Sequence, residues 1–229
     1  MSKTRALALF AALVAAIAAG CSRANPLLAP RPALVAAPAP DSFLVLVQTT
    51  RGDVLLKARR NWAPLGVDRF YYLARNGFYD GARFFRVLPG FVAQFGIPAD
   101  PAVAAVWRER GLPDDRPSAS NRRGTVSFAH GGPGTRTTQL FINLRDNSRL
   151  DTLGGVGFPP IGEVVQGMHV VDSLHAGYGE GPPRGTGPAQ DSIRLQGNSY
   201  LDRGFPRLDA IRSVRVITEW NRAQRTGSD

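Results

Sequence analysis

Short apolar runs recur along most of this sequence, and glycine, proline and polar residues separate them. Runs of about four to eight residues bounded by turn-forming residues are typical of β-strands. With 43% hydrophobic residues among 229, the chain has enough apolar material for one core. The pattern predicts a mainly β fold, a sandwich or a barrel. The expected strands are Leu44–Thr49, Val54–Lys57, Phe84–Leu88, Phe91–Phe95, Thr125–Ala129, Gln139–Leu144, Ile161–Val165 and Ile211–Thr218.

Two segments have helical spacing instead. In Pro64–Arg75 the apolar residues recur at helical intervals. Pro64 suits a first helical turn, and Gly77 suits the position just after the last turn. Met168–Leu174 is a second, shorter helical pattern. The chain is therefore expected to combine many strands with few helices.

Two longer segments carry no strand pattern. Residues 98–122 contain a short helix-like stretch over Ala102–Arg110, followed by a polar loop. Residues 177–208 are rich in glycine and proline, so we expect them to be irregular.

The N-terminus has the pattern of an export signal. Lys3 and Arg5 precede the apolar run Ala6–Ala19, which is shorter than the roughly 20 residues of a membrane span. Gly20-Cys21 then resembles the cleavage site of bacterial lipoproteins. We expect residues 1–20 to be a signal peptide and Cys21, the single cysteine, to be lipidated. The protein would then be exported and held by its lipid at a membrane, facing the periplasm or the cell exterior. An ordinary secreted protein cut nearby is the alternative.

A segment rich in proline and alanine follows the signal. Residues 21–41 contain five prolines, and such a segment prefers extended polyproline conformations to a packed core. We interpret it as a tether, so that the folded domain spans residues 42–229.

Charge and metal-ligand content exclude several classes of protein. The net charge is +10, but the arginines are scattered, and no basic run of about 5–8 residues marks a nucleic-acid site. We therefore expect no nucleic-acid partner. One cysteine permits neither an intrachain disulfide nor a cysteine-based zinc site, and the three histidines form no HExxH motif. We expect no metal and no cofactor.

Two polar side chains interrupt the apolar runs at the centre of the chain. Arg86 lies within Phe84–Leu88, and Gln94 lies within Phe91–Phe95. A guanidinium among apolar neighbours is costly to desolvate without a partner, and it cannot act as a general base. Arg86 therefore either forms a buried ion pair or stabilises charge on a substrate. Strand alternation alone favours the ion pair.

A glycine-rich loop, His130–Gly134, follows the strand Thr125–Ala129. Its HGGPG sequence resembles the oxyanion loop of some α/β-hydrolases, but those enzymes also need a G-x-S-x-G elbow. The sequence contains no such elbow, which argues against a hydrolase. What remains is a groove with one fixed cation and one amide.

Three ordered blocks resemble those of the cyclophilin-type peptidyl-prolyl isomerases. Residues 77–81 read GFYDG, residues 84–87 read FFRV, and residues 89–94 read PGFVAQ, in the order and spacing of that family. Later blocks extend the match over roughly residues 44–175 and the last strand. They comprise residues 125–129, 139–143, 150–151 and 162–168.

The resemblance implies a closed eight-stranded antiparallel β-barrel with two capping helices. It implies cis–trans isomerisation of X–Pro bonds in unfolded or exported polypeptides, without a cofactor. Arg86 matches the family's catalytic arginine, which stabilises the twisted amide in the transition state. Proline-containing polypeptides are the implied partners, and we expect a monomer.

The resemblance also assigns a substrate groove to this chain. Gln94 matches the glutamine that holds a substrate carbonyl, and the main chain at His130 matches the part that pairs with the peptide. The implied substrate-binding residues are Phe91, Val92, Gln94, Ala129, His130, Gln139, Phe141, Leu150 and Phe158.

Four positions depart from the family pattern. Phe85 replaces a histidine, and His130 stands where asparagine is common. Arg149 stands where many members have tryptophan, and Phe158 stands where many have histidine. The last two leave an alternative open, a cyclophilin-like peptide-binding or chaperone module with little catalysis.

Overall fold

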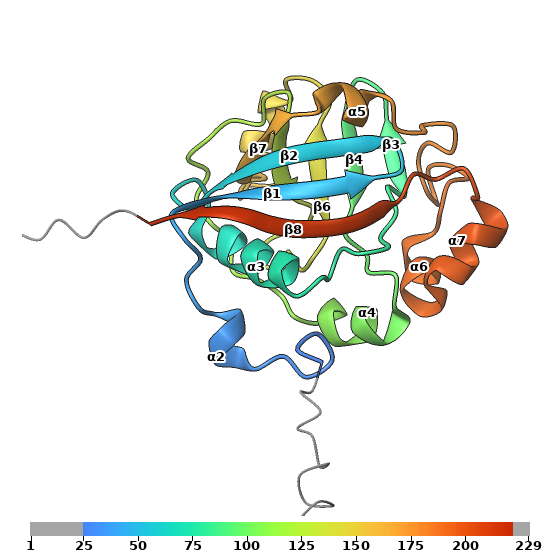
Figure 1. The fold of residues 1–229 in the computed structure, drawn as a ribbon. Coiled ribbons are helices and arrows are strands. Elements are labelled where there is room, and N and C mark those ends of the chain that lie inside the picture. The colour runs from blue at the N-terminus through green and yellow to red at the C-terminus, as the bar shows by residue number, and fades with distance from the viewer. Residues whose placement is uncertain (1–24, 222–229) are drawn as a thin grey trace, which may run out of the picture.

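The computed structural model describes residues 25–221, which form one antiparallel sheet with helices around it (Figure 1). Within these residues the sheet has eight strands in the order β3-β4-β6-β5-β7-β2-β1-β8. All the strands expected from the sequence are present, so the mainly β prediction is confirmed. Their bounds are β1 Ser42–Thr49, β2 Gly52–Arg59, β3 Arg86–Leu88, β4 Val92–Phe95, β5 Thr125–Phe128, β6 Leu140–Asn143, β7 Pro160–Gln166 and β8 Ile211–Trp220.

Alternating burial along the first strand shows which face of the sheet forms the core. Phe43, Val45 and Val47 on β1 are at most 4% exposed, while the residues between them are more exposed. Alternate side chains of a strand point to opposite faces, so these three face one interior. That interior is the largest cluster of buried apolar residues in the described chain.

The sheet curls without a continuous ladder between its two edge strands. An isolated bridge, Arg83 to Ala210, joins the segment before β3 to the segment before β8. The Phe84 amide donates to the Asp209 carbonyl at 3.0 Å. The closed barrel expected from the resemblance is therefore slightly overstated, because β3 has three residues and its ladder runs to β4. A few hydrogen bonds between loop segments connect the two edge strands β3 and β8 instead.

The two expected capping helices are present on different sides of the sheet. In Figure 1, α3 (Pro64–Arg75) lies below β8 and α5 (Met168–Asp172) lies above the strands. Asp115 accepts hydrogen bonds from the Leu65 and Gly66 amides at 2.9 and 2.8 Å. These amides lie in the first turn of α3, where helical N–H groups have no partner within the helix.

Four more α-helices and one short 3-10 turn lie outside the sheet in the described residues. The helices are α2 (Pro32–Val35), α4 (Pro101–Arg108), α6 (Gln190–Gln196) and α7 (Asn198–Gly204), and the 3-10 turn is η1 (Ser148–Asp151). α4 confirms the helix expected near residues 102–110.

The irregular structure expected for residues 177–208 is wrong in its second half. There α6 and α7 bury Ile193 and Leu201 in a small apolar cluster with Phe85. The glycines and prolines concentrate in residues 177–188, and this composition hid the helical part that follows.

The segment before β1 is more than a tether where the structure describes it. Leu27 is 7% exposed and belongs to the main core cluster. The Trp107 indole donates to the Leu27 carbonyl at 2.9 Å, and the Tyr72 hydroxyl donates to the Pro26 carbonyl at 2.9 Å. A proline-rich segment forms few hydrogen bonds of its own, so its carbonyls are free to accept from such side chains. Residues 25–41 therefore lie on the domain, whereas Cys21 and the expected signal peptide lie outside the described residues.

Candidate active site

The β3–β4 hairpin brings Arg86 and Gln94 together. These two residues are direct partners in the antiparallel register, and the Arg86 Nη1 atom donates to Gln94 Oε1 at 3.1 Å. Because a guanidinium can only donate hydrogen bonds, the amide oxygen of Gln94 must face it. The register thus turns two isolated polar positions of the sequence into one unit.

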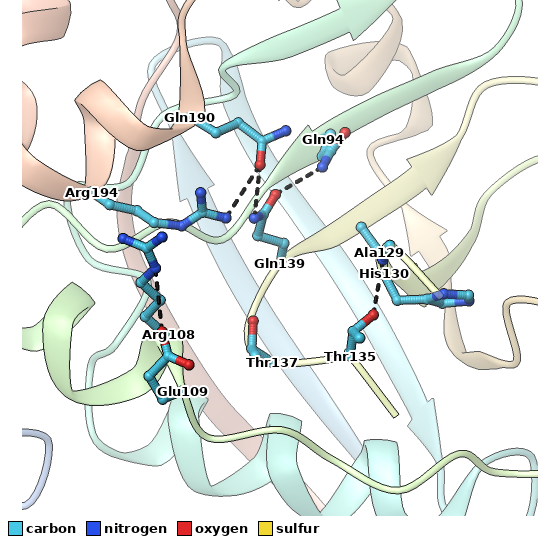
Figure 2. A pocket seen from close by; sticks show the side chains of 11 residues that line it. Gln94, Arg108, Glu109, Ala129, His130, Thr135, Thr137, Gln139, Gln190 and Arg194 are labelled. Atoms are coloured by element: carbon cyan, nitrogen blue, oxygen red, sulfur yellow. Dashed lines mark hydrogen bonds and ion pairs between the residues drawn. The ribbon is translucent and has the colours of Figure 1, made fainter. Parts of the chain in front are cut away.

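A row of amide side chains fixes the orientation of Gln94. Its Nε2 atom donates to Gln139 Oε1 at 2.9 Å, and Gln139 Nε2 donates to Gln190 Oε1 at 3.0 Å. Figure 2 shows this row, with Arg194 next to Gln190. Gln94 and Gln139 are both buried, so neither amide can turn without losing a partner.

An ion pair occupies the other side of the Arg86 guanidinium. Arg86 Nε donates to Glu180 Oε1 at 2.7 Å, and Nη2 donates to Oε2 at 2.8 Å. Hydrogen bonding to Arg86 holds the pKa of the Glu180 carboxyl below its usual value, although burial opposes this. Arg86 therefore forms the expected ion pair, and the same guanidinium also lies on the wall of a pocket where it could contact a substrate.

That pocket has a volume of about 330 Å³ and an apolar floor. Val92, Phe141 and Leu150 form a buried cluster that is separate from the main core. The pocket brings together Arg86 and almost all of the substrate-binding residues expected from the resemblance. It is lined by Arg86, Phe91, Val92, Gln94, Ala129, His130, Phe141, Leu150, Leu153, Phe158, Glu180, Arg184 and Gln190.

A second pocket of about 420 Å³ lies next to the first (Figure 2). The two share the lining residues Gln94, Ala129, His130 and Gln190, so together they form one longer groove. Gln139, the remaining expected residue, lines this second pocket. Its far wall comes from the C-terminal end of α4, with Arg108 and the capping residue Glu109, and from Arg194 of α6.

His130 has a structural role in the wall between the two pockets. Its Nδ1 atom accepts a hydrogen bond from the Gly132 amide at 3.1 Å, so the ring proton belongs on Nε2. Nε2 then donates to the Gly157 carbonyl at 2.8 Å. The imidazole also stacks on the Phe158 ring, with centroids 4.0 Å apart. Both ring nitrogens are engaged, so the side chain is held as part of the wall.

The carboxylate of Asp151 supports the apolar wall of the pocket. Asp151 Oδ1 accepts from both the backbone amide and the Nδ2 of Asn121, each at 2.8 Å, and Oδ2 accepts from Ser120 at 2.6 Å. Asn121 Nδ2 also donates to the Phe158 carbonyl at 2.9 Å. The network therefore ties Phe158 to the turn that carries Leu150.

The pKa of Asp151 reflects the same network. Burial raises the pKa of the carboxyl, but the hydrogen bonds from Ser120 and Asn121 outweigh burial and bring it below its usual value. The carboxylate is therefore ionised at neutral pH and accepts the full set of bonds.

Two of the departures from the family pattern have clear surroundings. The Arg149 guanidinium lies 5.1 Å from the centre of the Phe91 ring, and that of Arg86 lies 5.8 Å from it. Phe85 is buried in the cluster under α6 and α7, which explains an apolar residue at that position. Phe91 is thus contacted by two cations at the mouth of the pocket.

The described residues contain neither a candidate metal site nor a candidate membrane-spanning helix. Among residues 25–221, no group of three or more His, Cys, Asp and Glu side chains is placed to hold a metal ion. Over the same residues, no helix combines the length and apolar character needed to cross a membrane.

The fold and the site together define a barrel-like protein with a polar–apolar surface groove. The family model "Cyclophilin type peptidyl-prolyl cis-trans isomerase/CLD" matches residues 44–196. The chain therefore belongs to the cyclophilin-type peptidyl-prolyl cis-trans isomerase family. This confirms both the resemblance and the class of enzyme expected from it.

Curated relatives carry the same family name. Peptidyl-prolyl cis-trans isomerase B of Escherichia coli is 34% identical over 136 residues, covering 57% of this chain and 83% of the relative. The isomerase of Acinetobacter baylyi is 31% identical over 150 residues, covering 62% and 76%. Cyp15 of Rhizopus delemar is 33% identical over 140 residues, but the match spans 21% of that longer protein.

Solved structures show the same fold at low sequence identity. A cyclophilin-type isomerase of Cryptosporidium parvum superposes with a TM-score of 0.55 at 20% identity, covering 78% of this chain and 99% of that one. The same protein in the presence of the dipeptide Ala-Pro gives a TM-score of 0.56 at 19% identity, covering 77% and 99%.

Proposed function

We propose that this chain catalyses cis–trans isomerisation of X–Pro bonds, with Arg86 as its catalytic residue. The observation that carries the proposal is the position of Arg86, hydrogen-bonded to Gln94 on the wall of an apolar pocket. Rotation about an X–Pro bond must break amide resonance, which for peptide bonds gives a barrier of about 18–20 kcal/mol. In the twisted state the prolyl nitrogen regains a lone pair, and a guanidinium can hydrogen-bond to it only then. Arg86 would therefore stabilise the transition state more than the ground state.

The other groove residues bind and orient the substrate in this proposal. The prolyl ring fits against Phe91, Phe141 and Leu150, which line the pocket beside Arg86. The amide of Gln94 is held by its neighbours in a fixed orientation, ready to contact a substrate carbonyl. No proton transfer is required, because the reaction makes and breaks no covalent bond.

An isomerisation assay on the full chain tests this proposal. We expect Arg86→Ala to lower kcat/KM for an Ala-Pro test peptide by about 10²- to 10³-fold, the usual loss when one preorganised donor is removed. Arg59→Ala is the matched control, because Arg59 pairs with Glu163 away from the groove. A folded wild type that gives no acceleration would refute the proposal. It would favour the peptide-binding or chaperone module instead, with Arg149 and Phe158 as the positions to change first.

We also propose that the protein is exported and anchored by a lipid on Cys21, where it acts on proline-containing polypeptides. The support is the sequence pattern of Lys3, Arg5, the apolar run 6–19 and Gly20-Cys21. Expression in a bacterial host with labelled palmitate checks this. Label on the protein and recovery in the membrane fraction are expected. If the protein is exported but carries no label, it is an ordinary secreted protein and the lipid anchor is refuted.

A further inference from the structure

The ion pair with Glu180 engages the Arg86 guanidinium before any substrate binds. Glu180 accepts hydrogen bonds from Nε and Nη2 of the guanidinium, and Gln94 accepts one from Nη1, so three of its five N–H donors are in use. The Arg86 and Glu180 side chains are 16% and 25% exposed, so water weakens this pair less than it weakens a surface pair. The cation that should meet the substrate is therefore already engaged, by a carboxylate on the same pocket wall.

The segment that carries Glu180 is anchored beside the groove at its base. The Tyr178 ring packs edge-on against Phe205 at 5.1 Å and against His175 at 5.0 Å. Tyr178 and Phe205 pack on the buried cluster that contains Phe85, the neighbour of Arg86 in the sequence. The base thus brings Glu180 to Arg86 across 94 residues of chain.

The tip of the same segment is compact but faces solvent. The Gly187 amide donates to the Glu180 carbonyl at 2.9 Å, and the Arg184 amide donates to the Gly181 carbonyl at 3.2 Å. A Cβ atom on Gly185 would come within 2.2 Å of the Glu180 carbonyl, so the turn requires glycine there. Residues 182–184 are exposed. The backbone hydrogen bonds that residues 181–187 form stay within residues 180–187, and a segment bonded in this way belongs to the part of a fold that opens at low cost.

We propose that Glu180 is a built-in competitor for Arg86, which a substrate must displace before the guanidinium can act on its prolyl amide. In the free protein the carboxylate satisfies Arg86 and keeps the groove occupied. When a polypeptide binds, the tip moves aside while Tyr178 holds the base in place. Glu180 therefore sets the substrate affinity of the site. This inference rests on the proposed isomerase function.

The variant Glu180→Gln tests the inference, because glutamine has the same shape but no charge. We expect a tetrapeptide with Ala-Pro at its centre to bind about 5–30-fold more tightly, measured by calorimetry, which corresponds to about 1–2 kcal/mol. The value of kcat/KM should rise by a similar factor, through KM. The matched control is Glu163→Gln, which removes a carboxylate from a comparable pair with Arg59 outside the groove and should change neither quantity. Equal or weaker peptide binding by Glu180→Gln would overturn the inference, because Glu180 would then orient Arg86 or be inert.

A second measurement needs no variant and remains decisive if Glu180→Gln fails to fold. The Arg86 Nε–H signal in the NMR spectrum of the wild type reports the ion pair directly. We expect it to shift during titration with the tetrapeptide, over the same concentrations as the signals of Phe141 and Leu150. If the pocket signals titrate while the Nε–H signal stays in place, Glu180 is not displaced and the inference is wrong.

The two readouts separate this inference from the proposed function. If Glu180→Gln binds the peptide more tightly but neither protein catalyses isomerisation, the proposed isomerase function is refuted and the competition for Arg86 is supported. If the wild type catalyses isomerisation but Glu180→Gln binds the peptide with unchanged affinity, the isomerase function is supported and the competition for Arg86 is refuted.

Discussion

Replacing Asp151 with alanine tests whether the network behind Leu150 holds the pocket in shape. In the structure the carboxylate accepts from the Asn121 amide, from Asn121 Nδ2 and from Ser120. Asn121 is fully buried, so its backbone N–H and one N–H of its Nδ2 would lose their acceptor inside the protein, while the other Nδ2 hydrogen keeps the Phe158 carbonyl. Each unsatisfied buried donor costs about 1–3 kcal/mol. Ser120 is partly exposed and can turn to water, so it adds little.

We therefore expect Asp151→Ala to lower the free energy of unfolding by about 3 kcal/mol. For a domain of this size the thermal midpoint should fall by about 6–12 °C, measured by circular dichroism. KM for an X–Pro peptide should also rise, because Leu150 and Phe158 form the apolar wall that the network ties together.

Asp151→Asn is the informative control, since one oxygen accepts both Asn121 bonds. That oxygen, Oδ1, is retained in asparagine, and the new amide nitrogen can donate to the Ser120 hydroxyl. We expect a loss of about 1 kcal/mol or less. If Asp151→Ala melts within 1 °C of the wild type, or if Asp151→Asn is as damaging as alanine, the reasoning from hydrogen-bond geometry is wrong.

Two further predictions concern buried charges. Burial raises the pKa of Asp209, but hydrogen bonds from His175, Thr50 and Arg51 outweigh it and leave the pKa below the usual value. A depressed carboxyl pKa stabilises the fold above the ordinary value of about 3.8 and ceases to do so as pH falls through the lowered one. The thermal midpoint should therefore fall steeply below about pH 4, and a flat midpoint down to pH 2 would contradict this. Asp115→Ala leaves Arg136, which is 1% exposed, without its closest carboxylate. This variant should lose about 3 kcal/mol or more in chemical unfolding, and a loss below 1 kcal/mol would refute that account.

The strands and the long helix were predictable because their signals are local. The apolar run in Leu44–Thr49 and the helical spacing in Pro64–Arg75 each need a dozen neighbouring residues or fewer to be recognised. Arg86 and Gln94 stood out for the same reason, as single polar residues within apolar runs. The match to ordered family blocks then supplied the other groove residues, which no local pattern marks.

What the sequence did not predict depends on contacts between distant segments. Glu180 lies in a glycine- and proline-rich stretch with no periodicity, and nothing near it in the sequence indicates Arg86 as its partner. Asp151 was visible as a carboxylate, but its donors come from residues about 30 positions earlier. The packing of Leu27 was hidden because a proline-rich composition resembles a free linker, whatever its carbonyls contact.

If the protein is anchored through Cys21 as proposed, the attachment of Leu27 to Trp107 would limit how far the domain can stand from the membrane. If all of residues 21–41 were free, an extended chain would let the domain move roughly 70 Å from a lipid on Cys21. With the chain held from Leu27 onward, the six steps from Cys21 reach at most about 20 Å. Arg108, the neighbour of Trp107, lines the second pocket, so the point of attachment lies beside the groove. An anchored molecule would thus survey a thin layer above the bilayer, and the polypeptides it meets would be those emerging through or lying along that surface.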